Sequence, residues 1–271
     1  MQMCLSLNKA AIQAAGFGVL YPGRDGIPEG RLKLKWPLPR QKDHADFVAK
    51  AARQMERHSE GRALVMSEEN ISGRMLHMQN GNFYGRVVER CKIIREAWPG
   101  PIGKVLYVTR AYDSFFISGY KLSALGRVRP AFADLKDTYL GLERGWPEVI
   151  AAVRDTLRPA SMEVVDYAVR GSSAALAARL IPGFEAAHLQ EPTRRVNLSG
   201  SDAALGEIQR CLAEGQTLSD AQIEEIIHSS EDGAGAFAPI AFSDGDKQIL
   251  RDRYAADLDK IAAMAGVDLI R

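Results

Sequence analysis

The sequence has few cysteines and no excess of charge of either sign. Its three cysteines, Cys4, Cys91 and Cys211, lie far apart among 271 residues. Such an odd, widely spaced set forms neither a disulfide framework nor a metal-binding motif, so we expect free thiols in a reducing compartment. The formal net charge of +1 indicates no overall attraction to nucleic acid or to a membrane surface.

Signals for export, membrane insertion and several enzyme classes are also missing. Residues 1–15 lack a basic start followed by an apolar block, and no apolar run approaches the roughly 20 residues that span a bilayer. The sequence contains no glycine-rich dinucleotide fingerprint, no histidine–glutamate metal signature and no nucleophile elbow. We therefore expect a cytoplasmic protein that holds no metal ion.

Short apolar runs are spaced regularly along a chain of ordinary composition, with 46% hydrophobic and 25% charged residues. Runs typical of strands occur at 18–22, 62–67, 104–109 and 162–167. Helical segments separate them, which predicts right-handed βαβ units and a parallel sheet. No repeat or low-complexity linker occurs, so we expect a single domain over residues 1–271.

Capping residues and apolar periodicity predict where the helices lie. Gly16 is the expected stop of the first helix, and Ser201 and Ser219 are expected N-caps, with Gln222 completing a capping box. Residues 202–271 are predicted to be helical. The segments with the clearest helical periodicity are 1–15, 43–55, 71–78, 84–98, 113–125 and 246–265.

The end of the clearest strand, 104–109, carries residues suited to an anion. In an open parallel sheet, ligands bind beyond the carboxyl ends of the strands. Arg110 stands there, and Ser114 and Ser118 share a face of the helix that follows. A guanidinium and a hydroxyl near a helix N-terminus favour a phosphate. The alternative is that Arg110 pairs with Asp113 and the serines are solvated.

The segment Tyr107-Val108-Thr109-Arg110, followed by Ser118-Gly119-Tyr120, resembles the 3′-phosphate-binding motif of sulfotransferases. The resemblance implies that Arg110 and Ser118 bind the 3′-phosphate of the co-substrate 3′-phosphoadenosine 5′-phosphosulfate (PAPS). Arg194 is a further candidate contact to the nucleotide, with a surface salt bridge as the alternative. Three more segments resemble bacterial sulfotransferase-like proteins in order and spacing, namely 18–22, 64–70 and 195–199.

The resemblance implies an α/β fold of three layers, α/β/α, with a central parallel sheet, like that of P-loop NTPases, and a helical C-terminal portion. The family's 5′-phosphosulfate loop, rich in glycine, lysine and threonine, has no counterpart in the sequence. Residues 1–5 resemble the helix that follows that loop. We therefore expect an N-terminally truncated domain, from a late start codon or a degenerate copy, with exposed apolar surface and weak activity.

Sulfuryl transfer needs a base for the acceptor hydroxyl. Glu69, Glu68 and His44 are the candidates. Glu69 follows a buried strand and resembles a glutamate of the bacterial relatives, so we favour it as base or acceptor-binding residue. Its alternative roles are to cap the next helix or to pair with Arg74. His44 lies in the first turn of a helix, where a solvated surface histidine is the alternative.

Two groups of residues could bind the acceptor, which the resemblance predicts to be a carbohydrate or a small metabolite. Aromatic residues either line its pocket or belong to the core. A basic loop either attracts an acidic glycan or is simply solvated. The aromatic residues are Trp36, Phe83, Tyr84, Phe115, Phe116 and Trp146, and the basic ones are Arg31, Lys33, Lys35, Arg40 and Lys42.

Three functional hypotheses follow. The first is a PAPS-dependent sulfotransferase that acts on a hydroxyl group, with no nucleic-acid or membrane partner. The second is a non-catalytic nucleotide-binding or interaction protein derived from the same fold. The third is a fragment without function, which predicts poor solubility and low thermal stability.

Overall fold

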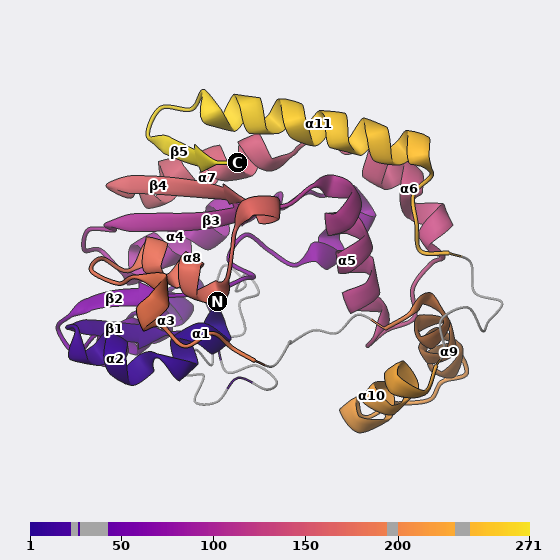
Figure 1. The fold of residues 1–271 in the computed structure, drawn as a ribbon, viewed down its shortest axis with the longest axis horizontal. Coiled ribbons are helices and arrows are strands. Elements are labelled where there is room, and N and C mark those ends of the chain that lie inside the picture. The colour runs from indigo at the N-terminus through magenta and orange to yellow at the C-terminus, as the bar shows by residue number, and fades with distance from the viewer. Residues whose placement is uncertain (23–26, 28–42, 194–199, 231–238) are drawn as a thin grey trace.

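The computed structural model describes residues 1–22, 27, 43–193, 200–230 and 239–271. Within these residues the fold is mixed α/β, with small parallel sheets packed against helices and a helical C-terminal part (Figure 1). Arg194, Trp36 and the predicted basic loop lie outside the described residues. In the described part of the chain, no helix is long and apolar enough to span a membrane.

The described strands form two separate parallel sheets. The first has the order β1-β2 and the second the order β3-β4-β5. Val19 lies opposite Val65 in the first sheet, and Tyr107 lies opposite Val164 in the second. The strands are β1 (Phe17–Leu20), β2 (Ala63–Met66), β3 (Lys104–Thr109), β4 (Ser161–Asp166) and β5 (Val267–Ile270). The four predicted strands are therefore confirmed, and the parallel direction with them.

Helices connect the strands and cover both sheets. Figure 1 shows α11 along the β5 side of the second sheet, and α9 and α10 beyond α5, away from the strands. The helices of the first half are α1 (Gln2–Leu7), α2 (Lys9–Ala14), α3 (His44–Ser59), α4 (Val87–Ala97) and α5 (Tyr112–Ala124). The later ones are α6 (Phe132–Leu140), α7 (Trp146–Leu157), α8 (Ser173–Leu180), α9 (Asp202–Ala213), α10 (Asp220–Ser229) and α11 (Asp244–Ala262).

The predicted helix caps are confirmed. The Ser201 hydroxyl accepts the amide hydrogen of Ala204 at 3.1 Å. Ser219 and Gln222 form the reciprocal capping box at the start of α10. Each such bond satisfies a backbone donor that has no partner within its helix. The three cysteines are free and buried, as expected from their spacing.

Three predicted elements differ from the structure. The single helix over 1–15 is broken at Asn8, whose side chain donates to the Cys4 and Gln190 carbonyl oxygens and accepts from the Gln190 amide. The segment 71–78 is no α-helix; a 3₁₀ helix, η2 (Met75–Asn80), takes its place. The C-terminal part is not helical throughout, because β5 follows Gly266, whose φ of 75° reverses the chain. Two further short 3₁₀ helices are η3 (Tyr167–Val169) and η4 (Ala186–His188).

One apolar core lies against both sheets. Leu64 and Met66 of β2 and Val105 and Tyr107 of β3 all pack on the same cluster of buried side chains, which is contributed largely by α4, α5, α7 and α11. On the other face, Val65 packs with Leu5 of α1 and other residues of α1, α2 and the end of α8. Apolar side chains therefore pack on both faces of the first sheet.

Replacing Gly18 with alanine should lower the free energy of unfolding by about 1–3 kcal/mol, the usual range for overpacking. A Cβ atom at Gly18 would clash with the His58 carbonyl oxygen and lie 2.7 Å from the Ser59 Cα, both on the backbone of α3. Urea unfolding measures the loss. Gly103→Ala is the control, since its Cβ would meet nothing within 4 Å. Equal effects of the two substitutions would contradict this explanation.

Candidate functional site

The carboxyl end of β3 holds Arg110 in a fixed place. Thr109, the last residue of the strand, is fully buried and its hydroxyl lies 3.0 Å from the Tyr254 hydroxyl. The Trp146 indole N–H donates to the Arg110 carbonyl oxygen at 2.9 Å. The Arg110 Nε donates to the Ser114 hydroxyl at 2.9 Å, one turn into α5. Strand, tryptophan and helix therefore position the guanidinium together.

Arg110 does not pair with Asp113, which was the alternative from the sequence. Asp113 is buried, and its carboxylate accepts hydrogen bonds from the Ser114 amide at 2.7 Å and from the Arg251 Nε at 3.0 Å. Within the part of the chain that the structure describes, Arg110 forms no ion pair. A partly buried guanidinium with no carboxylate partner is suited to an anionic ligand.

A second arginine, which the sequence did not single out, contacts the same aromatic ring as Arg110. It is Arg170, just after the 3₁₀ helix η3 that follows β4. Its guanidinium lies 3.5 Å from the centre of the Tyr167 ring, and that of Arg110 lies 4.7 Å from the same ring. Because β3 and β4 are parallel neighbours, the residues after both strands meet at one edge. The same rule points to the end of β4, but not to Arg170 itself, which lies four residues beyond the strand.

Together, Arg110, Arg170 and Tyr167 form what we call the arginine edge. Two guanidinium groups offer forked donors that match the oxygens of a phosphate or sulfate. The aromatic ring holds both by cation–π contact. Ser118, the other predicted 3′-phosphate residue, is half-buried on α5 one turn after Ser114. Each guanidinium can bind an anionic oxygen at this edge of the sheet.

The loop after β2 carries two of the candidate bases. Glu68 is buried, and its carboxylate accepts the Asn70 amide hydrogen at 2.9 Å. Arg90 from α4 donates to the carbonyl oxygens of Asn70 and Ile71, at 2.7 and 3.0 Å. Burial lowers the pKa of Arg90, and Glu68 opposes that shift. Glu68 is thus part of the loop's framework, whereas Glu69 is exposed.

His44 is the third candidate base, and the structure pairs it with a surface carboxylate. It is the first residue of α3, and its Nε2 lies 2.7 Å from the Glu96 carboxylate of α4. The two side chains are 40% and 47% exposed. A histidine held in this way joins two helices at the surface. With Nε2 bonded to Glu96, its Nδ1 is the ring nitrogen that could take a proton from an acceptor.

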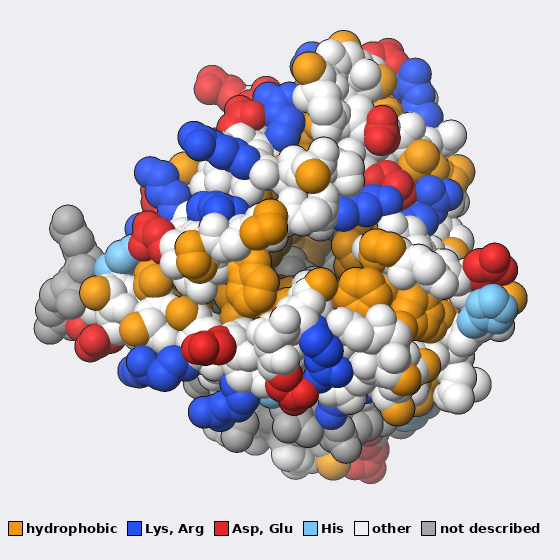
Figure 2. Space-filling view, turned by 90° about the vertical axis from the view of Figure 1, so that its left-hand side faces the viewer, with side chains coloured by type: hydrophobic (Ala, Val, Ile, Leu, Met, Phe, Trp, Pro, Cys, Tyr) orange, Lys and Arg blue, Asp and Glu red, His pale blue; other side chains and the backbone are white. Residues whose placement is uncertain are grey.

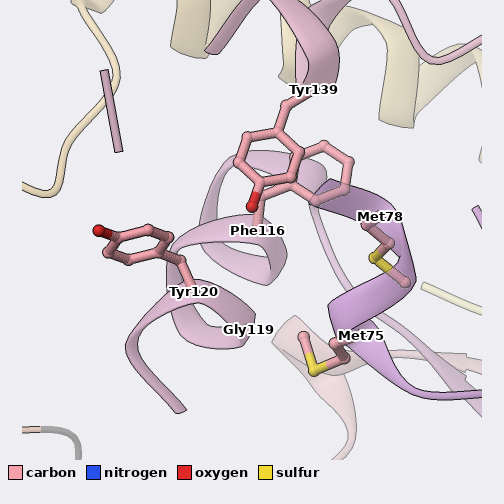
Figure 3. Close-up of a pocket in the computed structure, with 6 residues that line it drawn as sticks. All are labelled: Met75, Met78, Phe116, Gly119, Tyr120 and Tyr139. Atoms are coloured by element: carbon pink, nitrogen blue, oxygen red, sulfur yellow. The ribbon is translucent and has the colours of Figure 1, made fainter. Parts of the chain in front are cut away.

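Most of the predicted acceptor-binding aromatic residues belong to the core. Phe83, Tyr84, Phe115, Phe116 and Trp146 are buried, and their rings contact one another edge-on or tilted. The pocket in Figure 3 lies next to them and is a shallow depression without room for a water molecule between its lining side chains. Its lining is free of charged groups and consists of Met75, Met78, Phe116, Gly119, Tyr120 and Tyr139. It does not suit an anion.

Neither a metal centre nor a known relative defines the site further. The described residues contain no group of three or more histidine, cysteine or acidic side chains that could hold a metal ion. Comparison of the chain with models of protein families, with curated proteins and with solved structures gives no match in any of the three. Among the described residues, the arginine edge is the group whose chemistry best indicates a ligand, namely an anion.

Proposed function

We propose that the chain binds PAPS and transfers its sulfuryl group to a hydroxyl of a carbohydrate or small metabolite. The observation that carries the proposal is the arginine edge: two guanidinium groups without carboxylate partners in the described chain, at the carboxyl ends of adjacent parallel strands. Arg110 and Ser118 would hold the 3′-phosphate. Arg194 would add a contact from a segment outside the described residues.

The arrangement of strands and helices supports the finer fold that this proposal requires. All described strands are parallel, and helices cover both faces of the two sheets. We propose that this is the three-layer α/β/α architecture of the sulfotransferase and P-loop NTPase type in a single domain. In such a layer the carboxyl edge of the strands is where a nucleotide binds.

The reaction would be an in-line displacement at sulfur. The acceptor oxygen forms a bond to sulfur while the bond from sulfur to the 5′-phosphate oxygen breaks, and 3′-phosphoadenosine 5′-phosphate leaves. The acceptor proton passes to a base. Glu69, exposed after β2, is the base that we favour, and His44 could serve through Nδ1 while its Nε2 stays bonded to Glu96.

A second candidate function is nucleotide binding without transfer. One observation favours it: the side chains of the arginine edge, two guanidinium groups and a phenol ring, can bind an anion but include no base for an acceptor proton. The two functions share the 3′-phosphate site and differ in turnover. Mass spectrometric detection of a sulfated hydroxyl compound, after incubation with PAPS and an acceptor library, separates them.

Binding of 3′-phosphoadenosine 5′-phosphate should weaken about 10- to 100-fold in Arg110→Ala, because a charge-assisted hydrogen bond contributes about 1.5–3 kcal/mol. Isothermal titration measures the dissociation constants. The variant should bind adenosine 5′-monophosphate, which lacks the 3′-phosphate, as the unaltered chain does.

Arg210→Ala is the matched control. Arg210 lies on α9 and is paired with Glu207 and Glu214 on its own helix. This variant should bind the bisphosphate nucleotide normally. The proposal fails if the unaltered chain binds both nucleotides equally, or if Arg110→Ala and Arg210→Ala are indistinguishable.

A further inference from the structure

Tyr254 of α11 contacts the carboxyl ends of both β3 and β4. It is 6% exposed, and its hydroxyl lies 3.0 Å from the Thr109 hydroxyl and 2.9 Å from the Asp166 carboxylate. Thr109 is the last residue of β3 and Asp166 is the last residue of β4, and the two are opposite each other in the parallel ladder. A single phenol from α11 therefore joins the ends of the two strands.

The protons in this chain of hydrogen bonds have one possible order. An ionised carboxylate only accepts, so Tyr254 donates to Asp166, and its oxygen is left to accept from Thr109. Burial raises the pKa of Tyr254, so the phenol keeps its proton at neutral pH. The Asp166 carboxylate also accepts the Ala168 amide hydrogen, at 3.1 Å. The hydrogen bonds thus run from the end of β3 through α11 and the end of β4 to the start of η3.

Both ends of this chain of hydrogen bonds adjoin the arginine edge. Arg110 directly follows Thr109, and Tyr167 directly follows Asp166. The backbone pairing of β3 with β4 stops at Thr109 and Asp166, so side-chain contacts help to set how the next residues leave the sheet. The Arg110 guanidinium lies 4.7 Å from the centre of the Tyr167 ring, which Arg170 also contacts. This arrangement requires both strand ends to be held in register.

We propose that Tyr254 is a positioning residue for the arginine edge, which holds the ends of β3 and β4 so that Arg110 and Tyr167 stay in contact. Stability alone does not require polar groups here, because apolar side chains of the same shape can be as stable as a buried hydrogen-bond network. A fully satisfied network instead fixes one geometry. The role of Tyr254 in nucleotide binding rests on the proposed function, whereas its role in the geometry of the edge does not.

Two other contacts hold α11 to the start of α5, so Tyr254 can be altered without releasing the helix. The Arg251 Nε donates to the Asp113 carboxylate at 3.0 Å. The Tyr112 hydroxyl donates to the Asp257 carboxylate at 2.6 Å. Arg251, Tyr254 and Asp257 are three residues apart and share one face of α11. The variant Tyr254→Phe therefore removes the chain of hydrogen bonds while its neighbours on both sides keep α11 in place.

NMR of the arginine side chains tests the geometry of the edge and needs no ligand. An Nε–H proton close to the face of an aromatic ring is shifted to lower frequency by the ring current. In Tyr254→Phe, we expect the Nε–H signals of Arg110 and Arg170 to move toward those of solvated arginines, because their contacts with the Tyr167 ring loosen. The two signals are assigned by their loss in Arg110→Lys and Arg170→Lys.

This measurement has two controls. Tyr120→Phe removes another buried hydroxyl, which donates at 2.9 Å to the Pro130 carbonyl oxygen beyond the C-terminal end of α5, and it should leave both signals in place. Arg154 is the internal reference, because it donates to the Ala265 carbonyl oxygen just before β5, at the end of the sheet where the strands begin. Figure 2 views the molecule from that end, where basic and acidic side chains are interspersed.

Isothermal titration tests the consequence for binding. The affinity of Tyr254→Phe for 3′-phosphoadenosine 5′-phosphate should be about 2- to 10-fold lower than that of the unaltered chain, which is the effect of about one neutral hydrogen bond. Adenosine 5′-monophosphate, which lacks the 3′-phosphate, should bind equally to both. Tyr120→Phe should leave both dissociation constants unchanged, although each of the two variants should lose about 2–4 °C of Tm.

The positioning role is overturned if the Arg110 and Arg170 signals stay in place in Tyr254→Phe, or if they move equally in Tyr120→Phe. If the signals move while the unaltered chain binds neither nucleotide, the proposed function fails and the positioning role stands. If the signals move and the affinity for the bisphosphate nucleotide is unchanged, the role of Tyr254 in binding is overturned.

A second pair of variants serves if Tyr254→Phe does not fold. Thr109→Val has the same shape as the native residue but lacks the hydroxyl that donates to Tyr254, whereas Thr109→Ser keeps it. We expect the valine variant to move the Arg110 and Arg170 signals and the serine variant to leave them in place. Equal signals in the two variants would overturn the proposal.

Discussion

Replacing Trp146 with alanine should lower the free energy of unfolding by about 3–5 kcal/mol, as large truncations in a packed core do. Trp146 is 2% exposed, and its ring centre lies 5.0 Å from those of Phe83 and Phe115. Its removal would leave a cavity in the aromatic part of the core. Urea unfolding followed by circular dichroism measures the loss.

The same substitution should also disturb the arginine edge. The Trp146 indole N–H is the donor to the Arg110 carbonyl oxygen, at 2.9 Å. Trp146→Phe keeps most of the ring but loses this donor, so we expect a smaller loss of stability together with weaker binding of the bisphosphate nucleotide. Trp146 is thus a positioning residue that acts through Arg110.

Trp98→Ala is the matched control for size. Trp98 is half-buried at the end of α4, and its indole N–H donates to the Pro101 carbonyl oxygen at 3.4 Å. We expect a loss of about 1–2 kcal/mol, because less apolar surface leaves contact with the core. Similar losses for the two tryptophans would show that the aromatic cluster around Trp146 is less tightly packed than its ring distances indicate.

The sequence predicted the larger elements correctly where local chemistry decides them. The apolar run 104–109 is a strand, and Ser219 with Gln222 starts α10, because hydrophobic periodicity and capping act over a few residues. The break at Asn8 could not be predicted, since it depends on a hydrogen bond to Gln190, far along the chain. The four-residue strand β5 depends on β4 beside it in the same way.

For the candidate site, the sequence located one half of the arginine edge. Arg110 was found because it directly follows the clearest strand. Arg170 was missed because its approach to Arg110 depends on β3 and β4 being neighbours, which the spacing of the strands does not reveal. The engagement of His44 by Glu96 likewise joins two helices whose packing the sequence does not specify. Both the missed Arg170 and the pairing of His44 with Glu96 depend on contacts between elements that are separate in the sequence.

The fold should unfold cooperatively when the pH rises above about 10. Burial raises the pKa of the Tyr84, Tyr107 and Tyr112 hydroxyls above the ordinary tyrosine value of about 10. The Tyr112 shift is increased by its hydrogen bond to the buried Asp257 carboxylate at 2.6 Å. Burial also raises the pKa of Tyr139, to about 12.

The direction of the effect follows from proton binding. Below pH 10, these tyrosines are protonated in both the folded and the unfolded chain, and stability is unaffected by them. Above it, the unfolded chain releases protons that the folded chain retains, so unfolding becomes more favourable as the pH rises. Each deeply buried tyrosine then lowers the free energy of unfolding by about 1 kcal/mol per pH unit, until the pH reaches the pKa of that tyrosine in the folded chain. Several such tyrosines together offset much of the free energy of unfolding, which is about 5–15 kcal/mol for a typical domain.

A pH titration followed by tyrosinate absorbance and by circular dichroism measures this transition. The buried tyrosines should ionise in one step that coincides with loss of helix. Tyr84→Phe retains the ring and removes one of the raised groups, so its midpoint should move to higher pH. Tyr167→Phe, at the exposed arginine edge, should leave the midpoint unchanged. If absorbance rises gradually while the helix signal persists, the tyrosines ionise within the folded protein, and burial does not control their titration.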